Sequence, residues 1–226
     1  MDNYKIEKAP SYYSQAYNSI KEMIFNGVLK PGDRIYESKL ASEFQISRSP
    51  VREAIRSLEK DGLLLIDNKS KITVYKPTLK DIEDIYECRQ ALESQAARLT
   101  TRKASNKDLE KIENILLETN EKIEHFDDTL IQNIISLNTQ FHNLILSFSQ
   151  NSRLQNQSSH LNLLTHFYRS IDIYEHNRNM DIFNYHLKIF HFIKKRDEEK
   201  AAQTMYNHIN NDLQHLKDII SMNYTI

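Results

Sequence analysis

The chain of 226 residues contains no tryptophan, one cysteine and no apolar run near the ~18 residues that a membrane-spanning helix needs. This composition excludes a transmembrane protein. It also excludes a disulfide-stapled secreted domain, because Cys88 has no second cysteine in the chain to pair with. The N-terminal stretch lacks the apolar core of a secretory signal. Together these absences predict a protein of the reducing cytoplasm.

Glycine and proline are scarce, and their distribution divides the chain. All three glycines and all four prolines lie in residues 1–77. Residues 78–226 contain neither, and their apolar residues recur at helical spacing, so we expect helices joined by short polar turns. Residues 1–77 hold 13 Lys and Arg against 10 Asp and Glu, whereas residues 78–226 hold 17 against 21. We therefore predict two domains with a boundary at Pro77.

The pattern of residues 1–77 predicts three helices followed by a β-hairpin. The third helix starts at Pro50 behind an N-cap at Ser49, where the missing N–H of proline costs nothing. Two β-favouring runs then flank a polar tip. This order of elements is that of a winged helix-turn-helix. The five elements are expected at 12–25, 37–44, 50–60, 63–66 and 72–75.

Arginines mark the third helix as a candidate DNA reader. Arg52 and Arg56 lie one turn apart and away from the apolar stripe, and Arg48 comes just ahead of the predicted helix. Such a helix fits the major groove, where arginine can pair bidentately with guanine, while a basic hairpin tip meets the backbone or the minor groove. The same spacing also suits an ordinary solvated helix face, so spacing alone leaves both interpretations open.

Two stretches of this region, Leu29–Ile35 (LKPGDRI) and Ser47–Leu63 (SRSPVREAIRSLEKDGL), resemble the signature of GntR-type bacterial regulators. The resemblance implies that Arg48 and Arg52 contact operator bases and phosphates. The chain departs from it at Ser38, where relatives often have arginine, and at the hairpin tip, which lacks the usual glycine. The residues that we expect to bind DNA are Arg34, Arg48, Ser49, Arg52, Arg56, Lys69 and Lys71.

Residues 78–226 are expected to form six helices, and short connections favour an antiparallel bundle. Thr78 and Asp81 indicate a capping box at the start of the first helix, and Ser105 caps the second. The predicted fold class is therefore mainly α, an N-terminal winged helix-turn-helix plus a C-terminal antiparallel six-helix bundle. The six helices are expected at 79–102, 106–124, 128–149, 151–175, 180–196 and 198–220.

Four polar residues on apolar helix stripes are candidate metal ligands. Asn138 and His142 share one stripe, while His186 and His208 lie on two others. Three imidazoles and one oxygen from converging helices would suit a divalent transition metal such as zinc or nickel. Each histidine taken singly also fits the role of a core or surface residue satisfied by a neighbour, and that interpretation stays open.

The C-terminal region as a whole resembles the FCD effector-binding domain of GntR-type regulators, in its six-helix VanR-like form. Many such domains bind a metal through an aspartate and three histidines at the positions of Asn138, His142, His186 and His208, so here a neutral amide replaces the aspartate. The residues that carry the resemblance are Ile85–Arg89, Leu92–Glu93, Phe141–His142, His186, Met205 and His208–Ile209.

The resemblance also implies a small carboxylate effector close to the metal. Arg89 is the candidate partner for it, because guanidinium and carboxylate match as a bidentate fork. An ordinary role for Arg89, solvated or in an ion pair between helices, fits the sequence equally well.

The sequence predicts a transcriptional regulator. Residues 1–77 would read a palindromic operator in double-stranded DNA, and residues 78–226 would form a homodimer and bind a small organic acid that modulates operator affinity. One alternative is a regulator that senses metal alone. Another is a metal-dependent helical-bundle enzyme, which is disfavoured because the chain has no HExxH motif, no glycine-rich phosphate loop and no general base placed by a motif.

Overall fold

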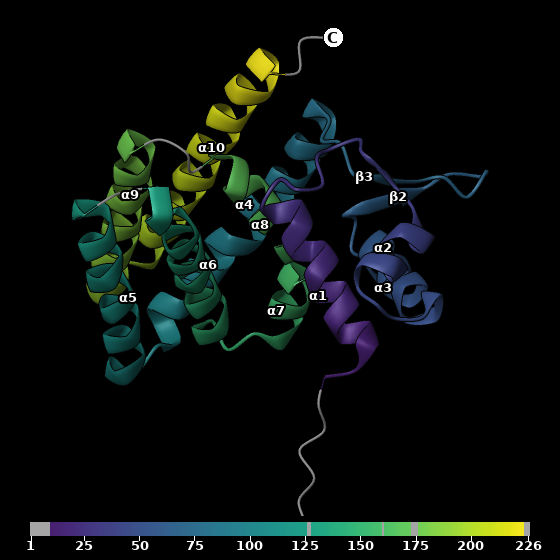
Figure 1. The fold of residues 1–226 in the computed structure, drawn as a ribbon. Coiled ribbons are helices and arrows are strands. Elements are labelled where there is room, and N and C mark those ends of the chain that lie inside the picture. The colour runs from purple at the N-terminus through teal and green to yellow at the C-terminus, as the bar shows by residue number, and fades with distance from the viewer. Residues whose placement is uncertain (1–9, 126–127, 160, 173–175, 224–226) are drawn as a thin grey trace, which may run out of the picture. The chain divides into compact units, whose positions relative to one another are not determined.

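The computed structural model describes residues 10–125, 128–159, 161–172 and 176–223. These residues form two compact units whose boundary lies between Pro77 and Thr78. The first unit holds three helices and a small sheet, and the second is built of helices, so the mainly α fold class is confirmed (Figure 1). Among the described helices, none combines the length and apolar character needed to cross a membrane.

The first unit is a three-helix winged helix-turn-helix. Its elements are α1 Tyr12–Phe25, β1 Arg34–Ile35, α2 Glu37–Glu43, α3 Arg48–Lys60, β2 Leu64–Ile66 and β3 Ile72–Val74. The strands are antiparallel in the order β1-β3-β2, with Arg34 of β1 opposite Thr73 of β3. The sequence pattern missed β1 because two residues are too few to show alternation.

Helix α1 packs along α3 and fixes its position. Ile20 of α1 and Ile55 and Leu58 of α3 are fully buried. Two tyrosines of α1 add hydrogen bonds: the Tyr13 hydroxyl lies 2.9 Å from Oγ of Ser57, and the Tyr17 hydroxyl donates to Oδ2 of Asp61 at 2.8 Å. The apolar face of α3 is thereby held inward, and its polar face is left to solvent.

Helix α3 begins two residues before the predicted start. The sequence pattern places the N-cap at Ser49, whereas in the structure Ser47 is the cap and Arg48–Pro50 form the first turn. The first N–H groups of a helix have no partner within the helix, so Pro50 is accommodated there without losing a hydrogen bond. Arg48 consequently belongs to α3 itself.

The hairpin between β2 and β3 turns without glycine. Oδ1 of Asp67 accepts the backbone N–H groups of Lys69 and Lys71, both at 2.8 Å, and Ser70 adopts a left-handed φ of 58°. The backbone hydrogen bond from Lys71 is the largest of the interactions that lower the pKa of the Asp67 carboxyl. The hydrogen bonds of the Asp67 side chain thus stabilise a hairpin turn that contains no glycine.

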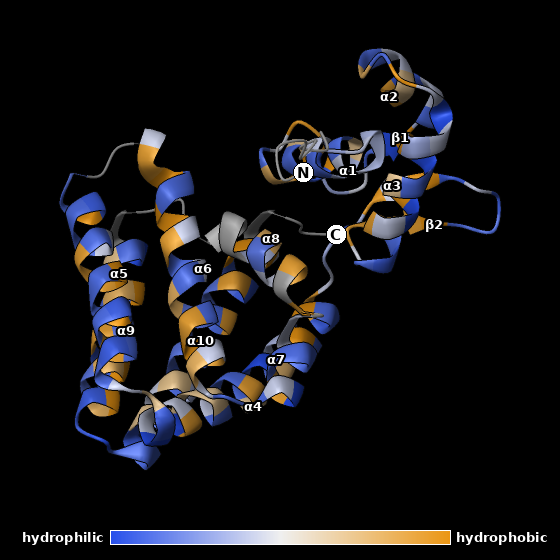
Figure 2. Cartoon of the chain, turned by 90° about the horizontal axis from the view of Figure 1, so that it is seen from below, coloured by the Kyte–Doolittle hydropathy of each residue, from blue (hydrophilic) through white to orange (hydrophobic). Residues whose placement is uncertain are grey.

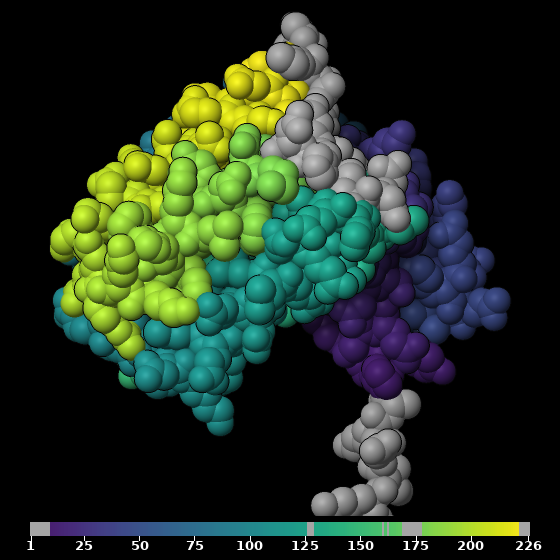
Figure 3. Space-filling model, turned by 90° about the vertical axis from the view of Figure 1, so that its left-hand side faces the viewer, coloured from purple at the N-terminus to yellow at the C-terminus, as the bar shows by residue number. Residues whose placement is uncertain are grey.

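Seven α-helices make up the described part of the second unit, and a short 3-10 turn at Asp128–Leu130 precedes the third of them. They are α4 Leu79–Lys103, α5 Asn106–Glu124, α6 Ile131–Phe148, α7 Ser152–Ser159, α8 Asn162–Asp172, α9 His176–Lys194 and α10 Glu198–Asn223. Figure 2 shows apolar and polar stripes alternating around these helices, as expected for a bundle. In Figure 3, α9 lies beside α5 although the two are far apart in the chain.

The single helix predicted over 151–175 is replaced by α7 and α8, which raises the helix count by one relative to the six predicted. Residues 160 and 173–175 of that stretch lie outside the described residues. The last turn of α7 ends in Ser158–Ser159, where the Ser159 hydroxyl donates to the carbonyl of Asn156 at 2.7 Å. Serine hydroxyls that bond to nearby backbone compete with helix continuation, which accounts for a break at this point.

The caps expected at Thr78 and Ser105 are present, although only Ser105 forms a reciprocal capping box, because the Asp81 carboxylate accepts from the Thr78 hydroxyl instead of its backbone N–H. The hydroxyl oxygen of Thr78 accepts the backbone N–H of Asp81 at 3.1 Å, so α4 begins at Leu79, directly after the boundary between the units. Ser105 and Asp108 form a reciprocal capping box at α5. These caps fix the starts of the first two bundle helices.

Candidate functional site

A cleft of about 490 Å³ opens on the first unit between α3, the β1 to α2 segment and the start of β3. Its lining includes one carboxylate, Glu37, and five cationic side chains. The structure thus brings together five of the seven residues predicted to bind DNA, while Ser49 and Lys69 lie outside the lining. The five are Arg34, Arg48, Arg52, Arg56 and Lys71.

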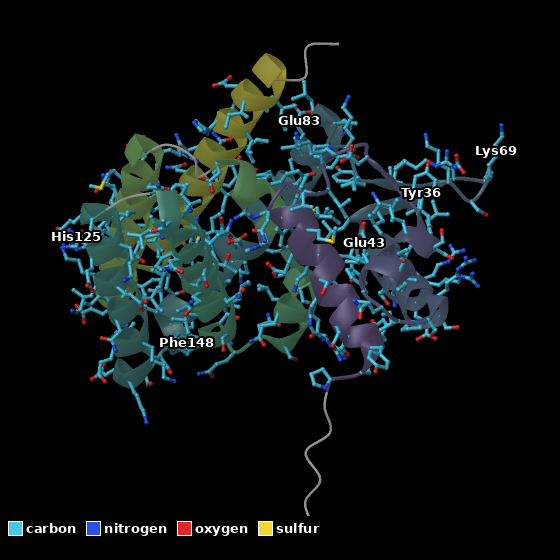
Figure 4. All side chains as sticks on the ribbon, viewed as in Figure 1. Tyr36, Glu43, Lys69, Glu83, His125 and Phe148 are labelled. Carbon is cyan, nitrogen blue, oxygen red and sulfur yellow. The ribbon has the colours of Figure 1, made fainter. Side chains whose placement is uncertain are left out.

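The geometry of α3 explains this grouping. Arg48, Arg52 and Arg56 recur every fourth residue and are exposed, whereas Val51 and Ile55 on the opposite side of the helix are fully buried. An arginine row therefore runs along the solvent face of one helix. Lys69 extends from the outer end of the hairpin, as Figure 4 shows.

Most cleft arginines already have weak partners. Nε of Arg52 lies 3.1 Å from Oε2 of Glu37, and Arg34 stacks 4.8 Å from the ring centre of Tyr36. The side chain of Arg52 remains 61% exposed, so its ion pair is screened by water and worth about 0–1 kcal/mol. A phosphate or a base edge can replace such a partner at small cost.

Three histidines meet in the core of the second unit, one each from α6, α9 and α10. Nε2 of His208 lies 3.1 Å from Nε2 of His186 and 3.3 Å from Nε2 of His142. All three side chains are buried, with exposed fractions of 2% or less. The three sequence stripes predicted to carry ligands therefore converge. Each histidine also has a hydrogen-bonding neighbour, so the interpretation of core residues satisfied by their neighbours fits the same arrangement.

Asn138, the fourth predicted ligand, lies one turn before His142 on α6. Its side chain is 4% exposed, and its Oδ1 atom has no hydrogen-bond partner. Asn138 and His186 both line a small cavity of about 10 Å³. A buried carbonyl oxygen without a partner is costly, and a cation or a water molecule would relieve that cost.

A carboxylate on α4 sets the protonation of His142. Oε2 of Glu93 lies 2.5 Å from Nδ1 of His142, and its Oε1 accepts from Nε of Arg89 at 2.8 Å. Because the paired carboxylate can only accept, the Nδ1 of His142 donates, and in the neutral form of the ring Nε2 then carries the lone pair. Glu93 was not predicted as a site residue, although its i+4 spacing from Arg89 signals an ion pair.

A second carboxylate, Asp212, stands behind His208. Its Oδ1 lies 3.7 Å from Nδ1 of His208, too far for a hydrogen bond, and accepts from Nη2 of Arg178 at 2.5 Å. Burial chiefly, with the charges of the other two histidines and of Arg89 and Arg178, holds the pKa of His208 well below its usual value. The imidazole of His208 is therefore neutral near pH 7, which is the form that binds metals.

The nitrogen spacing fits a divalent transition metal. Zinc lies about 2.0–2.1 Å from imidazole nitrogen, which separates two nitrogens of a tetrahedral site by about 3.3 Å and of an octahedral one by roughly 3 Å. The two separations from His208, 3.1 and 3.3 Å, fall in that range, and the ligand atoms of all three histidines lie within 4.8 Å of one another. His142, His186 and His208 could hold such an ion, and Asn138 stays a predicted fourth ligand.

Arg89 is buried in an ion pair with one side of its guanidinium unused. Its side chain is 1% exposed, and its Nη1 and Nη2 atoms have no hydrogen-bond partner. Burial opposes the charge, but Glu93, Tyr86 and Asp212 outweigh it and raise the pKa of Arg89 above its usual value. A cavity of about 10 Å³ adjoins it, lined also by Ser158, whose hydroxyl is unpaired too.

Two family models match the parts of the chain that contain the basic cleft and the histidine cluster. Residues 12–74 match the bacterial regulatory proteins of the gntR family, and residues 84–211 match the FCD domain. The chain is a GntR-family transcriptional regulator. The matched residues contain both the basic cleft of the regulator and its histidine cluster.

Relatives of this regulator carry names that agree with the family. It is 42% identical over 221 residues to the uncharacterized HTH-type transcriptional regulator YdhC of Bacillus subtilis (strain 168). This alignment covers 97% of each chain. It is 27% identical over 191 residues to the Nta operon transcriptional regulator of Aminobacter aminovorans, covering 84% of this chain and 88% of that one. These names are those of regulators and not of enzymes.

Solved structures agree on the fold. Escherichia coli McbR/YncC superimposes with a TM-score of 0.76 at 21% identity, covering 93% of this chain and 99% of that one. A putative transcriptional regulator GntR from Rhodococcus sp. RHA1 superimposes with a TM-score of 0.73 at 18% identity. This alignment covers 92% of this chain and 99% of that one. At such identities the likeness establishes the arrangement of the helices and strands alone.

Proposed function

We propose that this regulator binds a palindromic operator as a homodimer, and that a divalent metal and a small carboxylate effector in its second unit modulate operator affinity. GntR regulators bind DNA and usually act as dimers. A twofold dimer presents two copies of α3, and two copies of one reader match a palindromic site. The observation that carries the metal part is the convergence of three histidine Nε2 atoms in a buried site.

The DNA-binding part is supported by the cleft. Arg48 and Arg52 lie along the exposed face of α3, where a helix in the major groove presents its side chains to base edges and phosphates. Arg34 and Lys71 line the same cleft from the sheet, and Ser49, Arg56 and Lys69 complete the proposed contact set. Phosphate contacts by these cations would position α3, while the α3 arginines would read sequence.

The metal part is supported by the orientation of the rings. Glu93 accepts from Nδ1 of His142, so in the neutral ring the lone pair on Nε2 faces His208. When no cation is bound, only an N–H group of a neighbouring histidine can satisfy that lone pair. Zinc or nickel accepts lone pairs from all three nitrogens and from the amide oxygen of Asn138. The bound ion would tie α6, α9 and α10 together.

The effector part is supported by Arg89. Two unpaired guanidinium nitrogens in a buried position are donors in the geometry that a carboxylate accepts bidentately. A ligand that binds this unit changes DNA affinity only through its different affinity for the DNA-bound and free arrangements of the dimer. A carboxylate is the chemical group that would pair with these donors, so a small organic acid is the class of effector that we propose.

The experiment combines selection of DNA with ligand titration. Full-length protein is mixed with random duplex pools, and the enriched motif is used in fluorescence anisotropy at fixed salt. We expect a palindromic motif whose affinity changes with zinc or nickel plus a small carboxylate. Absence of any enriched motif would refute the DNA part. A response to metal without any response to carboxylates would establish instead a regulator that senses metal alone.

A further inference from the structure

One acidic side chain lies among the cations of the basic cleft. Among the described residues that line the cleft, Glu37 is the one carboxylate, and its two oxygens lie 3.1 and 3.4 Å from Nε of Arg52. Glu37 is the first residue of α2, and Leu40 and Ala41 in the next turn of that helix are buried. The side chain of Glu37 is 26% exposed against 61% for Arg52, so the carboxylate is the more enclosed member of the pair.

The ion pair uses one edge of the Arg52 guanidinium. Within the described residues, the hydrogen bonds of Arg52 all leave from Nε, so Nη1 and Nη2 are available to a ligand. Two such N–H groups can pair with O6 and N7 of guanine. A base can therefore bind Arg52 while Glu37 keeps its contact with Nε, whereas a phosphate that takes the Nε edge has to displace the carboxylate.

The negative charge of Glu37 also acts on DNA directly. Binding to random DNA depends on phosphate contacts made by lysine and arginine side chains. A carboxylate beside these cations repels phosphates and weakens binding to every duplex alike. The orientation of Arg52, in contrast, strengthens binding only where the matching base is present. Both effects raise the ratio of operator affinity to random-duplex affinity.

We propose that Glu37 is a positioning residue that holds Arg52 ready to read a base and weakens binding through phosphate contacts alone. This inference rests on the DNA-binding part of the proposed function. A free arginine side chain has many rotamers, and that freedom is lost when the side chain docks on a base. Glu37 reduces this loss because Arg52 is already held in the free protein. The carboxylate therefore lowers the affinity for DNA in general and raises sequence specificity.

The test uses full-length protein, the operator selected from random pools and a random duplex of the same length, in fluorescence anisotropy at fixed salt. A bidentate contact of arginine with guanine discriminates against the wrong base by about 5- to 150-fold. We expect Glu37→Ala to lose much of this, so that the ratio of operator to random-duplex affinity falls about tenfold. The affinity for the random duplex should rise about twofold to threefold, because a repulsive charge is gone.

Two variants separate the position of the carboxylate from its charge. Glu37→Asp keeps the charge but is one methylene shorter, so operator affinity should fall about threefold or more while random-duplex affinity changes by less than about twofold. In an Arg52→Ala background there is no arginine to position. Glu37→Ala added to that background should raise the affinities for both duplexes by the same factor, as a double-mutant cycle measures.

Glu43→Ala is the matched control. It removes a carboxylate from the same helix, at an exposed position outside the cleft lining, where its partner is Lys39. We expect the ratio of the two affinities to change by less than about twofold. Circular dichroism checks that each variant is folded, and Glu37→Asp carries the test if Glu37→Ala is not.

The outcomes separate the inference from the function on which it rests. An operator whose affinity ratio is unchanged in Glu37→Ala overturns the role of Glu37 and leaves DNA reading by α3 standing. An equal fall of the ratio in the wild-type and Arg52→Ala backgrounds shows that the carboxylate does not act through Arg52 and overturns the positioning role. Absence of any enriched motif refutes the DNA part of the proposed function, and the inference fails with it.

Discussion

The basic cleft of the first unit and the histidine cluster of the second place their charged and polar groups in opposite environments, one open to water and the other buried. In the cleft, Arg48 and Arg52 are exposed on one helix, and the ion pair of Arg52 with Glu37 is open to water. In the cluster, His142, Glu93 and Arg89 are almost fully buried and hydrogen-bonded in series across two helices. Water stabilises each charge in the cleft, so its ion pair contributes little free energy and a new partner can replace the old one. Burial makes each contact in the cluster strong, so its loss is strongly destabilising.

The buried ion pair offers the sharpest test of this contrast. Glu93→Ala leaves the charge of Arg89 buried without its partner, so the free energy of unfolding should fall by about 3–5 kcal/mol. The matched control is Glu113→Ala, which removes the partner of Lys194 in an exposed pair of the same unit and should cost about 0–1 kcal/mol. Urea denaturation of the full-length chain measures both. Equal losses would mean that the two pairs do not differ.

Removal of one histidine tests whether the cluster acts as a unit. Structural zinc sites contribute about 10–16 kcal/mol through four ligands, so loss of one ligand should weaken binding by roughly 3–4 kcal/mol. His142→Ala and His186→Ala should therefore each fail to retain metal through dialysis. Elemental analysis measures this, and His191→Ala, an exposed histidine of α9, is the control that should retain it. Equal metal in all three variants would contradict the site.

Removal of one cleft arginine should have a smaller and more selective effect. Arg52→Ala should weaken binding to the selected operator by about 1–3 kcal/mol and leave thermal stability nearly unchanged, since the lost ion pair is exposed. Lys60→Ala, an exposed change at the end of α3 and outside the cleft lining, should have little effect. Fluorescence anisotropy at fixed salt measures the difference. An unchanged affinity of Arg52→Ala would count against α3 as the reader.

The hairpin tip should show the smallest effect and one independent of sequence. Lys69→Ala should weaken binding to specific and random duplexes alike and reduce the slope of log affinity against log salt by about 1. This result would distinguish a phosphate contact from base reading by Arg52. A loss confined to the specific duplex would assign Lys69 a base contact instead.

Local signals were sufficient for most of the first unit and for the first two helices of the second. Helical apolar spacing, Gly27 after the first helix and the capping residues Thr78 and Ser105 each act within a few residues, and the corresponding helices are where they were predicted. The misplaced cap of α3 has a local reason as well. Pro50 is tolerated at any of the first positions of a helix, so the proline alone does not distinguish Ser47 from Ser49.

The second unit was less predictable where a contact joins distant segments. The sequence singled out Asn138, His142, His186 and His208 because each interrupts an apolar stripe. Glu93 was named only among the residues that carry the family resemblance and Asp212 was not singled out, because a carboxylate in a charged helix is unremarkable until the fold buries it. The spacing of Asp212 four residues after His208, like that of Glu93 after Arg89, was the available signal.

Most of the helices, the arginine row on α3 and the apolar stripes follow from the amino-acid sequence, because these depend on residues within a turn or two of one another. The meeting of Nε2 atoms from three helices within hydrogen-bonding distance, and the orientation of one of those rings by Glu93, follow from the packing of the bundle. The same packing buries Arg89 with two of its three guanidinium nitrogens unpaired. Such features require the packing of segments up to 66 residues apart, and no local pattern encodes which polar atoms that packing will leave facing one another.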